Sequence, residues 1–124
     1  LKELGIIRSD RYLGDIGEYI FKQVKPEAIL ENNLRAKGHD AIVNGQKYQI
    51  KLHNSKIGTN IYIGNIDEYD NLIVIIGPDS LLIADQRNYF MVFEFTKSEL
   101  KLINKPYIAK NELKTKSFIN YDLE

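Results

Sequence analysis

The sequence predicts a mixed β-sheet flanked by helices, in an α/β or α+β sandwich. Three observations predict this fold class: an amphipathic helical pattern over residues 15–25, a hairpin signal at Asn44-Gly45, and a continuous β-branched run over residues 72–76. With 124 residues, 44% of them hydrophobic and 27% charged, the chain is large enough to bury a core as one domain. We therefore expect a single globular unit without internal repeats or linkers.

The amino-terminal part of the chain is expected to be helical. Residues 1–12 indicate a short helix or arm, and Gly14-Asp15 is typical of a helix start. Over residues 15–25 apolar side chains recur at three- and four-residue spacing, which predicts an amphipathic helix that ends before Pro26. The buried stripe of this helix is expected to contain Ile16, Tyr19, Ile20 and Val24. Residues 27–38 show no regular pattern.

Residues 40–51 are predicted to form a β-hairpin around Asn44-Gly45, because both central residues of a type I′ turn need a positive φ. Counting outward from the turn pairs Asp40 with Gln49. Since side chains alternate along a strand, the hairpin has two different faces. One face carries Asp40, Ile42, Lys47, Gln49, Lys51 and His53, and the other carries Ala41, Val43, Gln46, Tyr48, Ile50 and Leu52. The second face suits packing in a hydrophobic core, and the first, polar face suits a catalytic or binding site.

The remaining elements follow from apolar runs and turn signals. Residues 53–60 indicate a loop, residues 61–63 a short apolar piece, and the acidic segment 67–70 a loop that caps a strand. The run 72–76 is typical of a central strand covered on both faces. Residues 81–84 and 89–95 predict two more strands joined by a turn at 85–88, and Thr96 to Glu99 forms a capping box that opens a helix. The pattern from residue 106 to the end is weak.

Composition excludes several classes of site. The chain has no cysteine and two histidines, which excludes disulfides and thiolate metal sites and argues against zinc, so that any metal is expected to be oxygen-bound. No apolar run is long enough to cross a bilayer and no basic-then-apolar leader opens the chain, so a soluble cytoplasmic protein is expected. Because the sequence begins at Leu1 without a methionine, we expect a fragment or domain of a longer chain.

The formal net charge of zero argues against a strongly basic, non-specific nucleic-acid binder, but not against DNA binding, since clustering matters more than the sum. Basic residues gather in two groups. The first contains Arg35, Lys37, Lys47, Lys51 and Lys56, and the second contains Lys101, Lys105, Lys110, Lys114 and Lys116. Scattered solvating charge explains the same pattern equally well.

The polar face of the hairpin suits a magnesium ion. Directly opposed residues in a hairpin have Cβ atoms about 5 Å apart, so that the Asp40 carboxylate and the Gln49 amide oxygen can share one ion. Magnesium takes oxygen ligands and commonly uses one or two protein carboxylates together with substrate phosphate oxygens. Lys51, two residues further on the same face, would lie beside the phosphate and offset its negative charge.

These residues resemble the PD-(D/E)XK nuclease superfamily, which includes restriction endonucleases and Holliday-junction resolvases. The resemblance covers roughly residues 10–95 and rests on Asp40, on Gln49-Ile50-Lys51, and on Glu18 in the helical segment Gly14-Asp-Ile-Gly-Glu18. The Gln-x-Lys variant is similar to that of methylation-dependent nucleases of the Mrr type. The chain departs from the family pattern in two ways: Gln49 replaces the usual second carboxylate, and His39 replaces the proline before Asp40.

The resemblance implies a restriction-endonuclease-like fold, with an αβββ core and a mixed central sheet flanked by helices. It implies a Mg²⁺-dependent endonuclease that hydrolyses DNA, with Mn²⁺ able to substitute. Asp40, Gln49 and the Ile50 main-chain carbonyl would hold the metal, Lys51 would assist the attacking water, and Glu18 would be accessory. Cleavage of both strands would need a homodimer or a partner subunit.

Two other functions remain open from the sequence. The first is a nuclease-like fold without catalysis that binds DNA or protein, in which Gln49 marks a decayed site. The second is a small interaction domain whose hairpin face simply faces water. Each residue also has a simpler interpretation: Asp40 is a turn residue, Gln49 and Lys51 are surface polar groups, Glu18 is a solvated charge, and His53 is an exposed loop histidine rather than a base.

Overall fold

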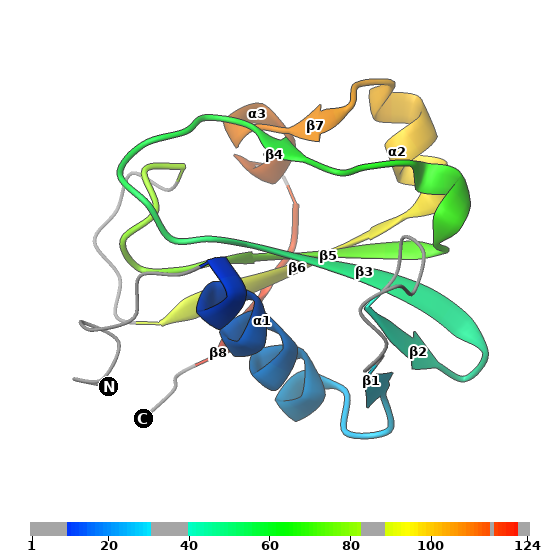
Figure 1. Cartoon of the computed structure of the whole chain (residues 1–124). Coiled ribbons are helices and arrows are strands. Elements are labelled where there is room, and N and C mark those ends of the chain that lie inside the picture. Colours follow the sequence, from blue (N-terminus) through cyan, green and yellow to red (C-terminus); the bar gives the residue numbers. More distant parts are fainter. Residues whose placement is uncertain (1–9, 31–39, 83–88, 115, 122–124) are drawn as a thin grey trace.

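The centre of the protein is a six-stranded mixed β-sheet (Figure 1). The computed structural model describes residues 10–30, 40–82, 89–114 and 116–121. The strand order is β1-β2-β3-β5-β6-β8. The bounds are β1 Ile29–Leu30, β2 Ala41–Val43, β3 Gln46–His53, β5 Asn71–Ile76, β6 Phe90–Thr96 and β8 Ile119–Tyr121. Strands β3 and β5 are parallel and the other neighbouring pairs are antiparallel, so that the predicted mixed sheet is confirmed.

Helix α1 (Asp10–Val24) covers one face of the sheet (Figure 1). Gly17 lies on its packed side: a Cβ at this position would lie 3.4 Å from Cγ2 of Ile50, an ordinary van der Waals contact. Ile20 and Phe21 are fully buried against the sheet, whereas Tyr19 is 53% exposed. The prediction that Tyr19 belongs to the buried stripe is therefore wrong, since Phe21 takes that place. The helix is also longer than predicted, because residues before 15 are already helical.

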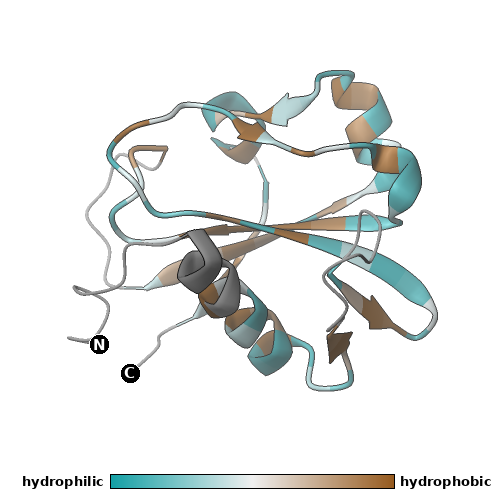
Figure 2. Cartoon of the chain, in the orientation of Figure 1, coloured by the Kyte–Doolittle hydropathy of each residue, from teal (hydrophilic) through white to brown (hydrophobic). Residues whose placement is uncertain are grey.

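A second layer covers the other face of the sheet. Its elements are β4 (Ile61–Tyr62), the 3₁₀-helix η2 (Ile66–Glu68), α2 (Lys97–Ile103), β7 (Tyr107–Ile108) and α3 (Lys110–Lys114). β4 and β7 pair as a separate two-stranded antiparallel ribbon, the β4–β7 ribbon. The core is thus divided by the sheet into two hydrophobic clusters, one under α1 and one under the second layer. Figure 2 shows the hydrophobic residues that run along the central strands between them.

Most predicted elements after the hairpin are present. Every residue of β5 is buried, as expected for a central strand. The capping box is confirmed, with Thr96 and Glu99 each accepting a main-chain N–H of the other at the start of α2. The acidic segment does cap a strand: Asp70, directly before β5, accepts the N–H of Lys47 at 2.8 Å.

The strand predicted over residues 81–84 is wrong in its described part. Leu81 and Leu82 lie in a turn, where their N–H groups donate to the Ser55 carbonyl and to the Ser80 hydroxyl. Residues 83–88, with the predicted turn, lie outside the described residues, as do residues 1–9 of the predicted arm and Arg35 and Lys37. β1, β7, α3 and β8 were not predicted. None of the helices in the described ranges is both long and apolar enough to span a membrane.

Candidate functional site

The hairpin that carries the candidate residues has the predicted register. Asn44 and Gly45 both have positive φ, 51° and 82°, as a type I′ turn requires. Ala41 pairs with Tyr48, Ile42 with Lys47, and Val43 with Gln46. The turn is fixed by local chemistry, since glycine and asparagine tolerate the left-handed conformation better than other residues. The prediction of which residues share a face is therefore confirmed as far as this ladder runs.

The two faces of β3 have different surroundings. Tyr48, Ile50 and Leu52 pack in the hydrophobic cluster under α1. By alternation, Gln49, Lys51 and His53 lie on the opposite face, in register with β5 residues that belong to the cluster under the second layer. All three are only partly exposed. This face of β3 is thus not fully open to solvent, because it borders the hydrophobic cluster under the second layer.

The Asp40 carboxylate lies at the edge of β3, beside the backbone of Ile50. The ladder between β2 and β3 ends at Ala41 and Tyr48, and Asp40 follows it with its N–H donating to the Tyr48 carbonyl at 2.8 Å. Its Oδ2 atom accepts the N–H of Ile50 at 2.9 Å. Because the N–H and C=O of one strand residue point to the same edge, the Ile50 carbonyl faces the same side as this carboxylate. The structure therefore brings the Asp40 carboxylate to the Ile50 N–H. The predicted pairing of Asp40 with Gln49 is not part of the ladder, and the sharing of one ion by their side chains stays a prediction.

Gln49 has an unusual environment for an amide. Its Oε1 atom is buried and accepts no hydrogen bond from any described residue. A buried acceptor without a donor costs about 1–3 kcal/mol, and in a native protein such a group is explained by local strain, by a catalytic role or by a bound ion or water. The side chain is therefore a fitting ligand for a cation that prefers oxygen.

Lys51 follows Gln49 by two residues on the same face of β3. Its side chain is partly exposed, and among the described residues no carboxylate forms a salt bridge with it. By contrast, Lys25, Lys105 and Lys116 are each paired with a glutamate. The Lys51 ammonium is thus available to a phosphate on the rim of the site.

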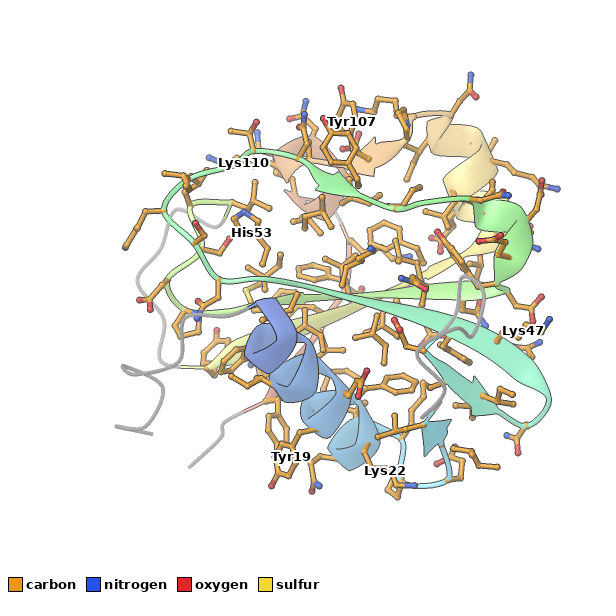
Figure 3. All side chains as sticks on the ribbon, viewed as in Figure 1. Tyr19, Lys22, Lys47, His53, Tyr107 and Lys110 are labelled. Atoms are coloured by element: carbon orange, nitrogen blue, oxygen red, sulfur yellow. The ribbon has the colours of Figure 1, made fainter. Side chains whose placement is uncertain are left out.

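His53 has a structural role in this arrangement. Its Nε2 atom lies 3.1 Å from the Gly58 carbonyl and its Nδ1 atom lies 2.7 Å from the Ser80 hydroxyl. Since a carbonyl only accepts, Nε2 donates, and in the neutral ring Nδ1 accepts from Ser80. The imidazole therefore joins the end of β3 to the following loop and to the turn after β5, between the sheet and the second layer (Figure 3). The interpretation of His53 as an exposed loop histidine is corrected, because both ring nitrogens are engaged.

Glu18 lies on α1, which packs on the face of the sheet opposite to Gln49 and Lys51 (Figure 1). Its side chain is partly exposed and has an interaction of its own. The geometry gives Glu18 no direct place beside the amide of Gln49, so its accessory role stays a prediction.

The donor set for a metal is small. Within the described residues, no three side chains of the His, Cys, Asp and Glu types come together as a metal-binding group. A cation at β3 would therefore depend on one carboxylate, one amide oxygen and one main-chain carbonyl. The unpartnered Gln49 Oε1 fits this set, and magnesium commonly leaves its other positions to water and substrate.

Sequence reasoning missed one exposed feature outside this site. Tyr62 and Tyr107 face each other on the β4–β7 ribbon. Strands of two residues carry no alternation to detect, and Tyr107 lies where the sequence pattern is weak.

The sequence was compared with protein-family models and with curated proteins. No family model matches the chain, and no curated protein matches it.

Proposed function

We propose that this chain is a magnesium-dependent endonuclease domain with a restriction-endonuclease-like fold, which hydrolyses DNA phosphodiester bonds. The observation that supports the proposal best is the buried, unpartnered Oε1 atom of Gln49, next to the residue whose N–H is bound by Asp40. A structural role alone explains the Asp40 carboxylate. It does not explain why the amide oxygen of Gln49, the residue before Ile50, is buried without a donor among the described residues.

Asp40, Gln49 and the Ile50 carbonyl would hold the ion, and Mn²⁺ would substitute for Mg²⁺. A divalent ion in such a site polarises a phosphate and generates a nucleophilic water. Lys51 would bind a non-bridging phosphate oxygen and offset the charge that builds up on phosphorus. Asp40 would also orient the β3 backbone through the Ile50 N–H, and Glu18 would be accessory. Two copies of the chain, or a partner subunit, would be needed to cut both strands.

The test is cleavage of supercoiled and linear DNA in Mg²⁺ and in Mn²⁺. Asp40→Asn is the most informative variant, because an amide oxygen can still accept the Ile50 N–H while the negative charge is lost. Lys51→Met removes the ammonium but keeps a chain that packs like the lysine stem. Both variants are expected to lose cutting and to unfold like the wild type.

Lys47→Met is the matched control for Lys51→Met, since Lys47 is an exposed lysine of the same strand and face, close to the turn. It is expected to cut normally. Cutting that survives the combined Asp40→Asn and Lys51→Met substitution would remove the assignment.

A second candidate is a nuclease-like fold that binds DNA or protein without cutting. It is favoured by the absence of an acidic cluster in the described part of the chain and by the neutral amide at residue 49. Calorimetric titration with Mg²⁺ and with Mn²⁺ separates the two functions. Saturable metal binding that Asp40→Asn weakens supports the nuclease, whereas DNA binding without saturable metal binding supports the module.

A further inference from the structure

Positive charge is concentrated in residues 97–116 of the second layer, while η2 of the same layer carries the acidic residues Asp67 and Glu68. Residues 97–116 contain six lysines and two glutamates, while the whole chain has a formal net charge of zero. Both glutamates are already paired within the segment, Glu99 with Lys116 and Glu112 with Lys105. The uncompensated charge therefore comes from the other lysines of the segment. These are Lys97, Lys101, Lys110 and Lys114, none of which has an acidic partner among the described residues.

An aromatic pair lies in the same layer. Tyr62 and Tyr107 face each other across the β4–β7 ribbon, with ring centroids 6.0 Å apart in an edge-to-face arrangement. The neighbouring residues Ile61 and Ile108 are buried, whereas Tyr62 is 65% exposed. The ammonium of Lys105 lies 5.2 Å from the Tyr107 ring centre. One face of this ribbon thus anchors it to the core, and the other presents a ring to solvent.

Two hollows border the ribbon, one at each end. A hollow of about 510 Å³ lies at the end of the ribbon where β4 ends and β7 begins. Its lining includes Gly64, Lys101, Lys105 and Pro106. A hollow of about 250 Å³ lies at the opposite end, where Lys110 is in the lining. Figure 3 shows Tyr107 and Lys110 on the side of the molecule away from α1, where Tyr19 and Lys22 lie. Lysines thus line the hollows at both ends of the ribbon that presents the exposed Tyr62.

We propose that the β4–β7 ribbon and its two hollows bind single-stranded nucleic acid. Tyr62 stacks on a base, and Lys101 and Lys110 contact phosphates on either side of it. Exposed aromatic rings between lysines are the elements that recognise single strands, because every base offers a face for stacking and the backbone is a polyanion. Lys105 and Lys110 are five residues apart in the sequence, which spans at most about 17 Å of chain and is enough for a few nucleotides. This surface is separate from the β3 site, and its occupancy does not require a metal.

The experiment measures fluorescence anisotropy of labelled oligonucleotides of about a dozen nucleotides, in EDTA so that no cutting occurs. Single-stranded DNA, single-stranded RNA and duplex DNA are titrated separately, with inorganic polyphosphate as competitor. We expect a single strand to bind more tightly than the duplex, and the DNA and RNA arms identify which strand is preferred. Duplex binding that is as tight, or full competition by polyphosphate at equal phosphate concentration, would overturn the proposal.

Tyr62→Leu tests the stacking. The expected loss of affinity is roughly 5- to 150-fold, as measured for single stacked bases. The matched control is Tyr19→Leu, an exposed tyrosine on α1 at 53% exposure, which is expected to bind normally. Tyr62→Trp separates stacking from a structural role of the ribbon, because it keeps an aromatic face. The chain has no tryptophan, so this variant has a single indole, whose fluorescence should be quenched when a base stacks on it.

Lys101→Gln and Lys110→Gln test the phosphate contacts. Each is expected to lower the slope of log affinity against log salt by about 0.7, with Lys47→Gln on β3 as the control of equal charge change. Unchanged slopes contradict the inference, as does a Tyr62→Trp variant that binds as well as the wild type without quenching of its indole. Asp40→Asn should leave this binding intact. The variants of Tyr62, Lys101 and Lys110 therefore test single-strand binding alone, and Asp40→Asn tests the nuclease alone.

Discussion

Gln49→Met is expected to make the metal-free protein more stable and to abolish its response to magnesium. In the wild type, the buried Oε1 atom of Gln49 has no donor among the described residues. Methionine has a similar length and flexibility and carries no strong acceptor, so that it fills the same space without the unmet hydrogen bond. Stability and function thus make opposite demands on this position.

The size of the effect follows from the burial of that atom. A buried, unsatisfied acceptor costs about 1–3 kcal/mol. The side chain as a whole is only partly buried, so its unmet hydrogen bond costs less than that of a fully buried group. We therefore expect a gain near the lower limit, about 1 kcal/mol. In a domain of this size that corresponds to a rise of about 3–5 °C in the midpoint of thermal unfolding.

The measurement is urea unfolding in EDTA, followed by the same titration at increasing MgCl₂. Wild-type protein should gain about 2.7 kcal/mol when magnesium reaches a hundred times its dissociation constant, and Gln49→Met should gain nothing. Gln46→Met is the matched control, because Gln46 lies on the same strand and its Oε1 already accepts from Asn71 at 2.9 Å. This control should lose stability and keep the magnesium response. A Gln49→Met protein that is less stable than wild type in EDTA, or that responds equally to magnesium, would refute the reasoning.

Three further outcomes concern the fold. Thr96→Ala should cost about 1 kcal/mol in urea unfolding, because it removes the side-chain acceptor of the Glu99 N–H at the start of α2. Burial raises the pKa of Tyr69 to about 12 from its ordinary value of 10.0, and its hydroxyl donates to the Ile63 carbonyl. The unfolded chain therefore releases this proton first, so stability should fall from pH 10 upward by roughly 2–3 kcal/mol near pH 12, and Tyr69→Phe should lack this loss. The hydrogen bond from Lys116, with that from the Thr96 N–H, holds the pKa of Glu99 below its ordinary 4.5. The resulting stability is present above pH 4.5 and is lost as the pH falls below it. Between pH 7 and pH 3, Lys116→Met should therefore lose less stability than the wild type in urea unfolding.

The hairpin was predictable because its signal is local. Asn44-Gly45 satisfies the φ requirement of the turn without help from the rest of the chain, and the register then follows by counting. The same holds for the Thr96 capping box, in which all donors and acceptors lie within four residues. Local chemistry thus accounts for these correctly predicted parts of the fold.

The buried face of α1 was less predictable. Ile16, Ile20 and Val24 define a stripe that tolerates either Tyr19 or Phe21 at its margin. In the structure Gly17 lies against Ile50 of β3, and Phe21, four residues later, lies on the same side of the helix and is buried. That choice depends on a contact between distant segments, and the sequence pattern of one helix does not contain it.

The packing of the second layer over the polar face of β3 was not predictable either. The β4–β7 ribbon joins residues 61–62 to residues 107–108, and each of its strands has only two residues. Neither periodicity nor turn chemistry marks such short pieces. The strand predicted over residues 81–84 failed for a related reason, since the Ser80 hydroxyl and the Ser55 carbonyl take the N–H groups that a strand would have offered to a neighbour.

The role of Asp40 depends on where β2 ends. Strand β3 continues to His53 beside β5, but its partner on the other side stops at Ala41, and the Ile50 N–H is the next donor on that edge. Asp40 fills this gap with its carboxylate, which satisfies the Ile50 N–H whatever the function of the chain. Loss of activity in Asp40→Ala would therefore carry little information, because it leaves that donor without its partner. Only a variant that keeps the acceptor and removes the charge, Asp40→Asn, asks whether the carboxylate also serves chemistry.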